Sequence, residues 1–466
     1  MTKTVTLEPV TRIEGHAKIS LECDDNGEVI KGHLHVLELR GFEKLVEGME
    51  CAKMPLITGR ICGVCPAAHH LASVIAIENG CGVTAPDEAR LLRELLYCGH
   101  LLHSHALSCF VLTGPDLLDY GNSGTEKSIF RMLSDHPELA KKALRLRSIG
   151  QKIVEKIGGR GIHPVTALPG GMSYRPSEDD IATIRGWGNE AIELLDSLYT
   201  VMTEKLSVLG SVREVTALPM KAVALSDNQE ISYLQGNAVI GDVTAGISGA
   251  FTAADYDGAL KEHIMPGSYM KSVRLADGAS YFVGPLARLL VNSRFTTPKA
   301  DALLQQFKDG STDRRTAFDA IQARCIEMVH FAERIVELSS ASSSDAPIFT
   351  PVTIGKGTFR GMIEAPRGIL IHDYATDEQG HIVTANLIVA TQNNYDAIDA
   401  TITALARSSK ANGSDEANLF NAMEFAVRCF DPCLSCATHV AGRMALQIDM
   451  HRNGTVFRTI TRGVNS

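Results

Sequence analysis

The chain has 466 residues, a formal net charge of −9 and eleven cysteines. An acidic chain matches neither nucleic acid nor an anionic membrane surface, because those partners are bound by clustered Lys and Arg. No window approaches the ~18 consecutive apolar residues of a spanning helix, and the N-terminal segment lacks the apolar stretch of a signal peptide. We therefore expect a cytoplasmic protein with no membrane insertion.

Alternating apolar and polar residues predict a small antiparallel sheet near the N-terminus. Its strands are expected over 2–10, 17–21 and 33–39. Apolar residues then recur at three- and four-residue spacing, which predicts four helices along the rest of the chain. These helices are expected over 87–112, 316–338, 395–406 and 416–429.

The segment between residues 160 and 300 has a weaker pattern. Glycine-rich sequences at 158–161 and 168–171 mark loops, and 210–290 mixes short strands with glycine-rich turns. No internal repeat, low-complexity tract or long linker divides the chain. The sequence predicts one α+β subunit with a core of long helices and small peripheral sheets.

Four of the cysteines form two Cys-x-x-Cys pairs, Cys62 with Cys65 and Cys433 with Cys436. Two residues between the thiols let one turn present both sulfurs to a metal, and in a reducing compartment paired cysteines indicate metal binding or catalysis rather than disulfides. The other seven have no close partner and are expected to pack in the core. They are Cys23, Cys51, Cys81, Cys98, Cys109, Cys325 and Cys429.

Several kinds of site use this spacing. A structural zinc site is one interpretation, but zinc ribbons place their pairs roughly 15–20 residues apart, whereas Cys65 and Cys433 are 368 positions apart. A thioredoxin-like dithiol accounts for only one pair. Soft thiolate ligands favour a redox metal. Four buried negative charges need more positive charge than one divalent ion provides, and two metals with a nearby Arg would provide it.

Six segments that contain these pairs and other polar residues follow one another along the chain. They are Glu8-Pro-Val-Thr-Arg-Ile-Glu14-Gly-His16, Arg40-Gly-Phe-Glu43, Arg60-Ile-Cys62-Gly-Val-Cys65, His103-Ser-His105, Glu364-Ala-Pro-Arg367-Gly and Phe430-Asp-Pro-Cys433-Leu-Ser-Cys436-Ala-Thr-His439. In this order they resemble the large, catalytic subunit of nickel–iron hydrogenases, and the resemblance covers most of the chain.

The resemblance implies the large-subunit fold and a nickel–iron centre. Cys62 and Cys433 match terminal ligands of nickel, while Cys65 and Cys436 match the cysteines that bridge nickel to an iron carrying cyanide and carbon monoxide.

Further positions match groups around that centre, which hold ligand geometry and tune the metals. His69 matches a histidine that hydrogen-bonds a bridging sulfur, although an ordinary core histidine is the alternative. Arg367 matches the arginine that lies over the metals, and Asp431 is expected to pair with it. Pro366 and Thr391 match groups that line the cyanides.

A second metal site is implied near the first. Glu43 and His439 match ligands of a separate Mg²⁺ (or Fe²⁺) ion, with the carbonyl of Leu387 as a third. Such an ion would tie the two ends of the chain together. Without the resemblance, Glu43 is typical of a solvated turn.

The implied reaction is the reversible heterolytic cleavage of H2, in which a Lewis-acidic metal accepts hydride and a nearby base accepts the proton. Cys433 is the expected base, because a thiol pKa falls near a metal. Arg367 stays protonated and is expected to orient and stabilise the bound species. Glu14 is expected to relay the proton outward, with a helix-cap or surface role as its alternative.

Three positions depart from the common family pattern. Gly59, Ser104 and Ala390 stand where uptake enzymes usually carry larger or acidic residues or proline. These departures resemble the cytoplasmic, bidirectional branch, with its NAD-linked and heterodisulfide-reductase-linked types. Without an acidic residue at position 104, Arg367 is expected to depend more on Asp431.

The C-terminal segment 440–466 has the pattern of an apolar hairpin with an Arg-Asn-Gly turn. In the family, a dedicated endopeptidase removes such a tail after nickel-insertion chaperones have delivered the metal. We therefore expect a single catalytic core over 1–439 and maturation ending at His439. A permanent C-terminal strand pair is the alternative.

The remaining cysteines do not have the spacing of an iron–sulfur relay, so electrons are expected to pass to a separate iron–sulfur small subunit. A diaphorase or flavin module, a ferredoxin or a heterodisulfide reductase module would accept them next. Two other classes stay open at this point: a respiratory complex I-type subunit, which lacks these cysteines, and a non-catalytic zinc- or nickel-binding structural protein.

Overall fold

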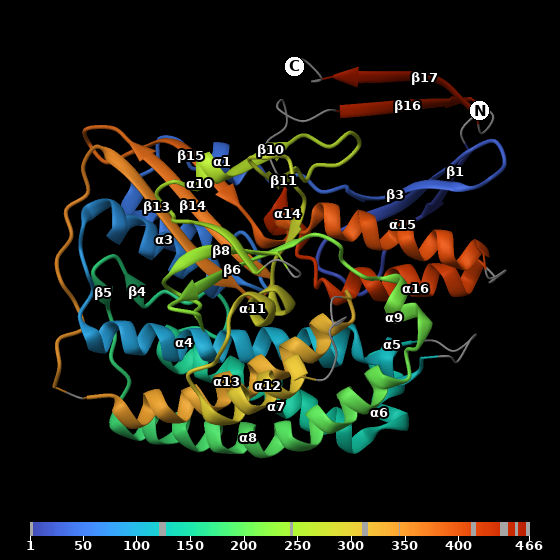
Figure 1. Ribbon diagram of the computed structural model, residues 1–466. Coiled ribbons are helices and arrows are strands. Elements are labelled where there is room, and N and C mark those ends of the chain that lie inside the picture. The colour runs from blue at the N-terminus through green and yellow to red at the C-terminus, as the bar shows by residue number, and fades with distance from the viewer. Residues whose placement is uncertain are drawn as a thin grey trace.

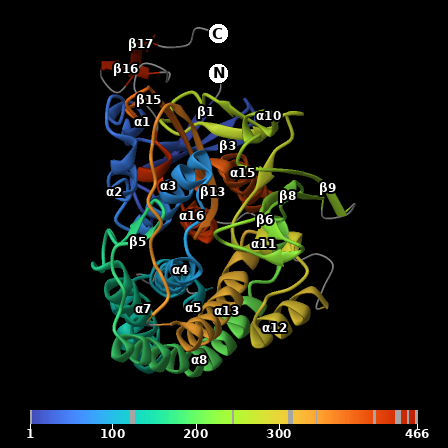
Figure 2. The same cartoon turned by 90° about the vertical axis from the view of Figure 1, so that its left-hand side faces the viewer.

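The computed structural model describes residues 3–120, 127–242, 246–309, 316–343, 345–411, 416–438, 446–452 and 455–462. Long helices form one layer of the molecule, and small sheets with shorter helices form the other (Figures 1 and 2). The predicted α+β class, with a core of long helices and small sheets, is confirmed.

Four helices pack against one another in the helical layer. They are α4 (Asp87–Ala106), α7 (Pro137–Gly158), α8 (Glu178–Ser207) and α13 (Asp319–Ala341). A π-helical turn, η2 (Leu107–Leu112), extends α4. Helices α4 and α7 cross where Gly150 meets Gly99, and a Cβ on Gly150 would lie 2.5 Å from the Gly99 carbonyl oxygen. Glycine is therefore required for this close approach.

The run 87–112 is the one described helix that is long and apolar enough, by length and composition, to cross a membrane. However, 78% of its most apolar window is buried inside the protein. Its apolar character is thus accounted for by its place in the helical core.

The layer of small sheets includes three antiparallel sheets. The first has the order β1 (Lys3–Leu7), β2 (Ala17–Cys23), β3 (Val29–Val36). The second has the order β13 (Gly357–Ala365), β14 (Gly368–Thr376), β15 (Ile382–Ile388) and packs against α3 (Pro66–Cys81). The C-terminal hairpin pairs β16 (Leu446–Arg452) with β17 (Thr455–Arg462), at the top of Figure 1.

The remaining strands form a five-stranded sheet and two small hairpins. They are β4 (Ala167–Leu168), β5 (Gly171–Met172), β6 (Lys221–Asp227), β7 (Glu230–Ile231), β8 (Asn237–Asp242), β9 (Gly246–Phe251), β10 (Leu260–His263), β11 (Ser272–Leu275) and β12 (Tyr281–Phe282). The remaining helices are α1 (Phe42–Leu45), η1 (Cys51–Lys53), α2 (Met54–Thr58), α5 (Gly114–Leu118), α6 (Ile129–Asp135), α9 (Ser211–Val215), α10 (Tyr256–Ala259), α11 (Pro285–Val291), α12 (Pro298–Asp309), α14 (Ala390–Asn393), α15 (Tyr395–Ala411), α16 (Glu416–Cys429) and α17 (Leu434–Ala437).

The N-terminal sheet and the four predicted helices are confirmed, as is the pairing of two strands in the C-terminal tail. Three long helices were not predicted, namely α3, α7 and α8. Helix α3 is buried on nearly every face, so it has no polar stripe to reveal a helical period. Helix α8 does carry a start signal, because Ser177 caps it ahead of three acidic residues.

Candidate metal centre

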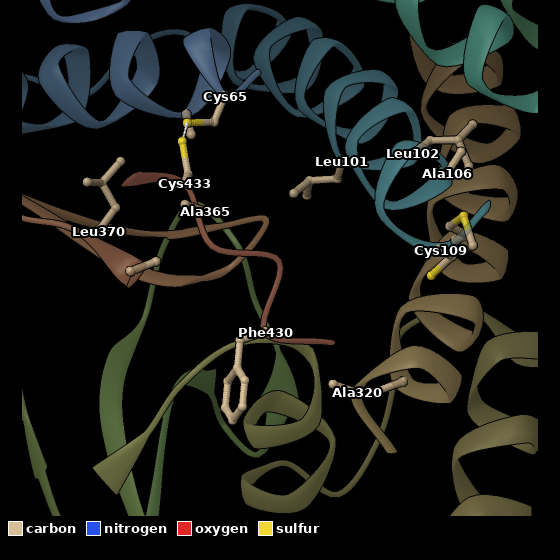
Figure 3. Close-up of a cluster of buried hydrophobic side chains, with 14 of the residues drawn as sticks. Cys65, Leu101, Leu102, Ala106, Cys109, Ala320, Ala365, Leu370, Phe430 and Cys433 are labelled. Carbon is tan, nitrogen blue, oxygen red and sulfur yellow. Dashed lines mark hydrogen bonds between the residues drawn. The ribbon is translucent and has the colours of Figure 1, made fainter. Parts of the chain in front are cut away.

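The two Cys-x-x-Cys pairs come together in the core. Cys62 precedes α3 and Cys65 is the N-cap of that helix, while Cys433 is the N-cap of α17 and Cys436 lies within it. The Sγ atoms of Cys62 and Cys433 are 3.2 Å apart, as are those of Cys65 and Cys436. Figure 3 shows Cys65 and Cys433 turning their sulfurs toward each other from the two ends of the chain.

All four sulfurs lie within 4.8 Å of one another, and all four residues are buried. In the part of the chain that the structure describes, this is the one cluster of His, Cys, Asp or Glu with that geometry. The cluster can bind a metal, because its donors are soft sulfurs that already converge on one point.

Burial and hydrogen bonds shift the pKa values of three of these cysteines. Burial raises the pKa of Cys433 and Cys436 well above the usual range. Hydrogen bonds from Cys433, Cys436 and Cys62 lower the pKa of Cys65 well below it. Burial thus opposes the charged form of Cys433 and Cys436, and placing four thiolates in this pocket requires a cation of high charge.

The predicted residues Glu14 and Thr391 come from other segments of the chain and contact the loop that carries Cys433. The Thr391 hydroxyl oxygen accepts a hydrogen bond of 3.0 Å from the Cys433 amide. The carbonyl of Glu14 accepts one of 3.1 Å from Leu434, and its carboxylate accepts one of 2.9 Å from the Ser435 amide. The carboxylate of Glu14 therefore lies next to the C-terminal cysteine pair.

Arg367 lies at the tip of a two-residue turn, because Ala365 and Gly368 pair across the β13–β14 ladder. Its Nη2 donates to Asp431 Oδ1 at 3.0 Å, and its Nε donates to the Asp431 carbonyl. This is the pairing expected from the departure at Ser104, whose buried hydroxyl has no partner among the described residues.

The charge of the Arg367 guanidinium is stabilised by Asp431 and by the cluster cysteines. Burial opposes its charge, but Asp431 and then Cys433, Cys65 and Cys62 hold its pKa well above the usual range. Its Nη1 is buried and has no partner among the described residues. The guanidinium is thus a fixed cation beside the cluster with one donor group unused.

His69 was predicted to bond a bridging sulfur, and a hydrogen bond from it lowers the pKa of Cys65. Its Nδ1 lies 3.1 Å from Nε2 of His372, whose Nδ1 lies 2.6 Å from the Tyr374 hydroxyl. The Tyr374 hydroxyl in turn donates to Ser73 at 3.1 Å. The sequence analysis missed His372 and Tyr374. They are two residues apart, and this spacing places two side chains on the same face only in a β-strand, which was not predicted here.

Two of the three residues predicted to hold a second metal, Glu43 and Leu387, lie in contact. The Glu43 carboxylate accepts a 3.0 Å hydrogen bond from the Leu387 amide. Both residues line a cavity of about 10 Å³ together with Cys436 and Thr438, which is room for a single water-sized sphere. His439, the other expected ligand, lies outside the described residues.

Six of the seven unpaired cysteines are buried, as predicted. Cys81 is the exception, because it ends α3 in a partly exposed position. It still packs against the buried core, so the prediction holds in full for six residues and in part for Cys81.

Known proteins share both the sequence and the fold. The family profile described as nickel-dependent hydrogenase matches residues 40–128 and 210–439, and a HoxL-like profile matches residues 4–39. A chain of the vhc F420-non-reducing hydrogenase of Methanococcus voltae is 33% identical, over 99% of this chain and 100% of that protein. The beta subunit of the NAD-reducing hydrogenase HoxS of Cupriavidus necator is 32% identical over 97% of each. A crystal structure of an NAD⁺-reducing NiFe-hydrogenase in the H2-reduced state superposes with a TM-score of 0.89 at 31% identity, over 94% of this chain and 100% of that one.

The chain belongs to the nickel-dependent hydrogenase family. It is the catalytic large subunit of a hydrogenase, an oxidoreductase that acts on H2. Its relatives include NAD-reducing and F420-non-reducing enzymes, in agreement with the branch indicated by Gly59, Ser104 and Ala390. The complex I-type class and the structural zinc protein are thereby set aside.

Replacing one cluster sulfur is expected to release metal. Cys436→Ser should weaken nickel retention by at least about 10- to 100-fold, the loss that removal of even an outer-shell partner causes, because a serine hydroxyl is a poor ligand for a soft metal. Metal content of the purified protein measures this. Cys81→Ser is the matched control and should retain nickel; equal nickel content in the two variants would contradict the assignment.

Proposed function

We propose that the four-sulfur site holds a nickel–iron centre at which the chain performs the reversible heterolytic cleavage of H2. Cys62 and Cys433 would be the terminal ligands of nickel, and Cys65 and Cys436 would be shared between nickel and an iron with cyanide and carbon monoxide ligands. The convergence of four buried sulfurs within 4.8 Å carries this proposal. Bound there, the metals supply a Lewis-acidic, redox-active centre.

The residues around the sulfurs fit this group. The unused Nη1 of Arg367 is a buried cationic donor of the kind that anionic cyanide ligands require. Pro366, in the same turn, and Thr391, bonded to the Cys433 amide, are assigned to the lining of the cyanide pocket. His69 is assigned to the bridging sulfur of Cys65, and Asp431 to holding Arg367.

Cys433 is proposed as the first proton acceptor. Its backbone is held by the Thr391 hydroxyl, and its sulfur lies 3.0 Å from that of Cys436. Arg367 remains charged beside it, so it orients and stabilises the bound species rather than taking the proton.

Glu14 is proposed to carry the proton outward. Its carboxylate is bonded to the amide of Ser435, whose hydroxyl donates to Glu38 at 3.1 Å. Glu38 pairs with His16, whose side chain is 74% exposed. These contacts place polar side chains between the cysteine loop and the surface.

The relay is tested by Glu14→Gln. The variant should keep its metals but lose H2 turnover by about 100-fold or more, the scale of general acid–base catalysis, because an amide cannot exchange the proton. H2 oxidation and metal content are measured together. Glu22→Gln, an exposed change on β2, should leave turnover unchanged, and full activity in Glu14→Gln would sink the relay.

The second ion is proposed to be Mg²⁺ or Fe²⁺, bound by Glu43, the Leu387 carbonyl and His439. The cavity between Glu43, Leu387 and Thr438 supports it, since Thr438 directly precedes His439. Carboxylate and carbonyl oxygens suit a hard cation.

The working form is proposed to be the core 1–439. A maturation endopeptidase would remove 440–466 after nickel-insertion chaperones have delivered the metal. One observation supports this. Thr438 is 7% exposed, so the chain is still buried one residue before the cleavage point.

Intact mass decides whether the tail is lost. Catalytically active protein should have the mass of residues 1–439, while metal-free precursor should keep the full 466 residues. An active enzyme that still carried 440–466 would refute the processing proposal and favour a permanent strand pair.

An iron–sulfur small subunit is the proposed partner. Gly63 is exposed between the buried Cys62 and Cys65, so the loop between these two cysteines reaches the surface. An electron acceptor seated on this face would contact that loop. A diaphorase or flavin module, or a heterodisulfide reductase module, would take the electrons next in the cytoplasm, in line with the names of the NAD-reducing and F420-non-reducing relatives.

The nickel–iron proposal as a whole is tested on active protein. Nickel and iron should be present in equal amounts, and infrared spectra should contain bands from bound cyanide and carbon monoxide. Metal analysis and infrared spectroscopy on one preparation measure both. Zinc as the sole metal, without those bands, is the result that overturns the proposal.

A further inference from the structure

A buried ionic layer lies directly behind the turn that carries Arg367. Its members are Arg288 on α11, Glu327 on α13 and Glu364 at the end of β13, and all three side chains are 0% exposed. The layer joins three elements that are distant in sequence. Arg288 is its centre, because both carboxylates bond to it.

Every donor of the Arg288 guanidinium is used. Two bonds of 2.5 and 2.7 Å go to the two oxygens of Glu327, and one of 2.7 Å goes to Glu364. The two that remain go to backbone, at 3.2 Å to the Ala365 carbonyl and 3.3 Å to the Pro366 carbonyl. The five N–H groups of an arginine are thus matched by five acceptors.

The two carbonyls belong to the residues immediately before Arg367. They lie in the tight turn between β13 and β14, so displacing them moves the Arg367 backbone. A second contact supports the same turn. Gly284, with φ +103°, precedes α11, and a Cβ there would lie 2.7 Å from the Arg367 carbonyl oxygen. The start of α11 therefore meets the turn through backbone as well as through Arg288.

Further hydrogen bonds hold the two carboxylates of the layer in place. Glu327 also bonds to Nε2 of His105 at 2.8 Å and accepts from the Tyr233 hydroxyl at 3.0 Å, and Glu364 accepts from the Leu225 amide at 2.8 Å. Burial alone raises the pKa of Glu327, yet the Arg288 charge and hydrogen bonds outweigh burial and lower this pKa to about 2. A buried network with its partners in place specifies one geometry.

We propose that Arg288 is a positioning residue for H2 cleavage, which sets the place of Arg367 over the four sulfurs through the backbone of Ala365 and Pro366. This inference rests on the proposed function, in which Arg367 orients and stabilises the bound species. Arginine is required, because the single ammonium of a lysine cannot bond to two carboxylates and two carbonyls at once, as a planar guanidinium does.

The test compares Arg288→Lys with Arg93→Lys. Arg93 is a matched control, since it makes two bonds to Glu78 and donates to the carbonyls of Leu168 and Gly171, in a turn remote from the sulfurs. Both substitutions keep the positive charge but replace the planar guanidinium, with its five donors, by a single ammonium group. Melting temperature, nickel and iron content, infrared bands of the diatomic ligands and H2-oxidation kinetics are measured on both whole enzymes.

Both variants should lose similar thermal stability and keep their metals. Only Arg288→Lys should show displaced or split cyanide bands, together with kcat lowered by about 10- to 100-fold, since a misplacement of about 1 Å costs roughly that much. Unchanged bands and kcat in a folded Arg288→Lys enzyme would overturn the positioning role. If the parent enzyme has no such bands, the proposed nickel–iron centre fails instead, so the two failures are distinguishable.

A milder variant covers the case in which Arg288→Lys does not fold. Glu327→Gln keeps the volume and one acceptor oxygen but removes the charge that grips Arg288. It should shift the same bands in the same direction by a smaller amount. Glu78→Gln, at the partner of Arg93, is its control, and equal band shifts in these two variants would also overturn the proposal.

Discussion

The structure depends on bringing four thiols from opposite ends of one chain into a single buried pocket. The two pairs are separated by 368 residues, yet their sulfurs lie within 4.8 Å. Burying one charge without compensation costs several kcal/mol, so such a pocket is stable only with cations and fixed dipoles around it. Much of the polar interior can be understood as the response to that demand.

Buried arginines form part of that response. Arg288, Arg324 and Arg428 are among the largest fully buried side chains, and Arg367 is 3% exposed. Arg324 donates to the Cys429 carbonyl at 2.8 Å, and Arg428 pairs with Asp116 at 3.1 Å. Both anchor the segment that leads into Cys433. Arg367 therefore balances charge at the sulfurs, while Arg324 and Arg428 hold the segment before the C-terminal pair in place.

The sequence motifs predicted the sulfurs and much of their surroundings, because those residues act through short, local patterns. Cys62 and Cys65 share one turn, and so do Cys433 and Cys436. Periodicity likewise revealed α4, which has one polar and one apolar side. Neither signal could reveal β13 and β14, since strands buried on both faces do not alternate.

The sequence analysis also could not predict residues whose role depends on tertiary contacts. His372 meets His69, and Arg288 meets the Arg367 turn, only after folding joins separate elements. Nothing in their neighbouring residues distinguishes them from other polar side chains. His439 stays a prediction, because it lies outside the described residues.

The helical layer has a role beyond forming a core. Glu327 belongs to α13 and His105 to α4, and together they brace Arg288, which in turn holds the backbone before Arg367. A shift of α13 against α4 would therefore reach the turn over the sulfurs through three side chains. Close packing of α4 on α7 through Gly99 and Gly150 holds α4 in place, because two backbones in contact leave no side chain that can rearrange. Through Arg288, the helical layer thus contacts the backbone turn that carries Arg367.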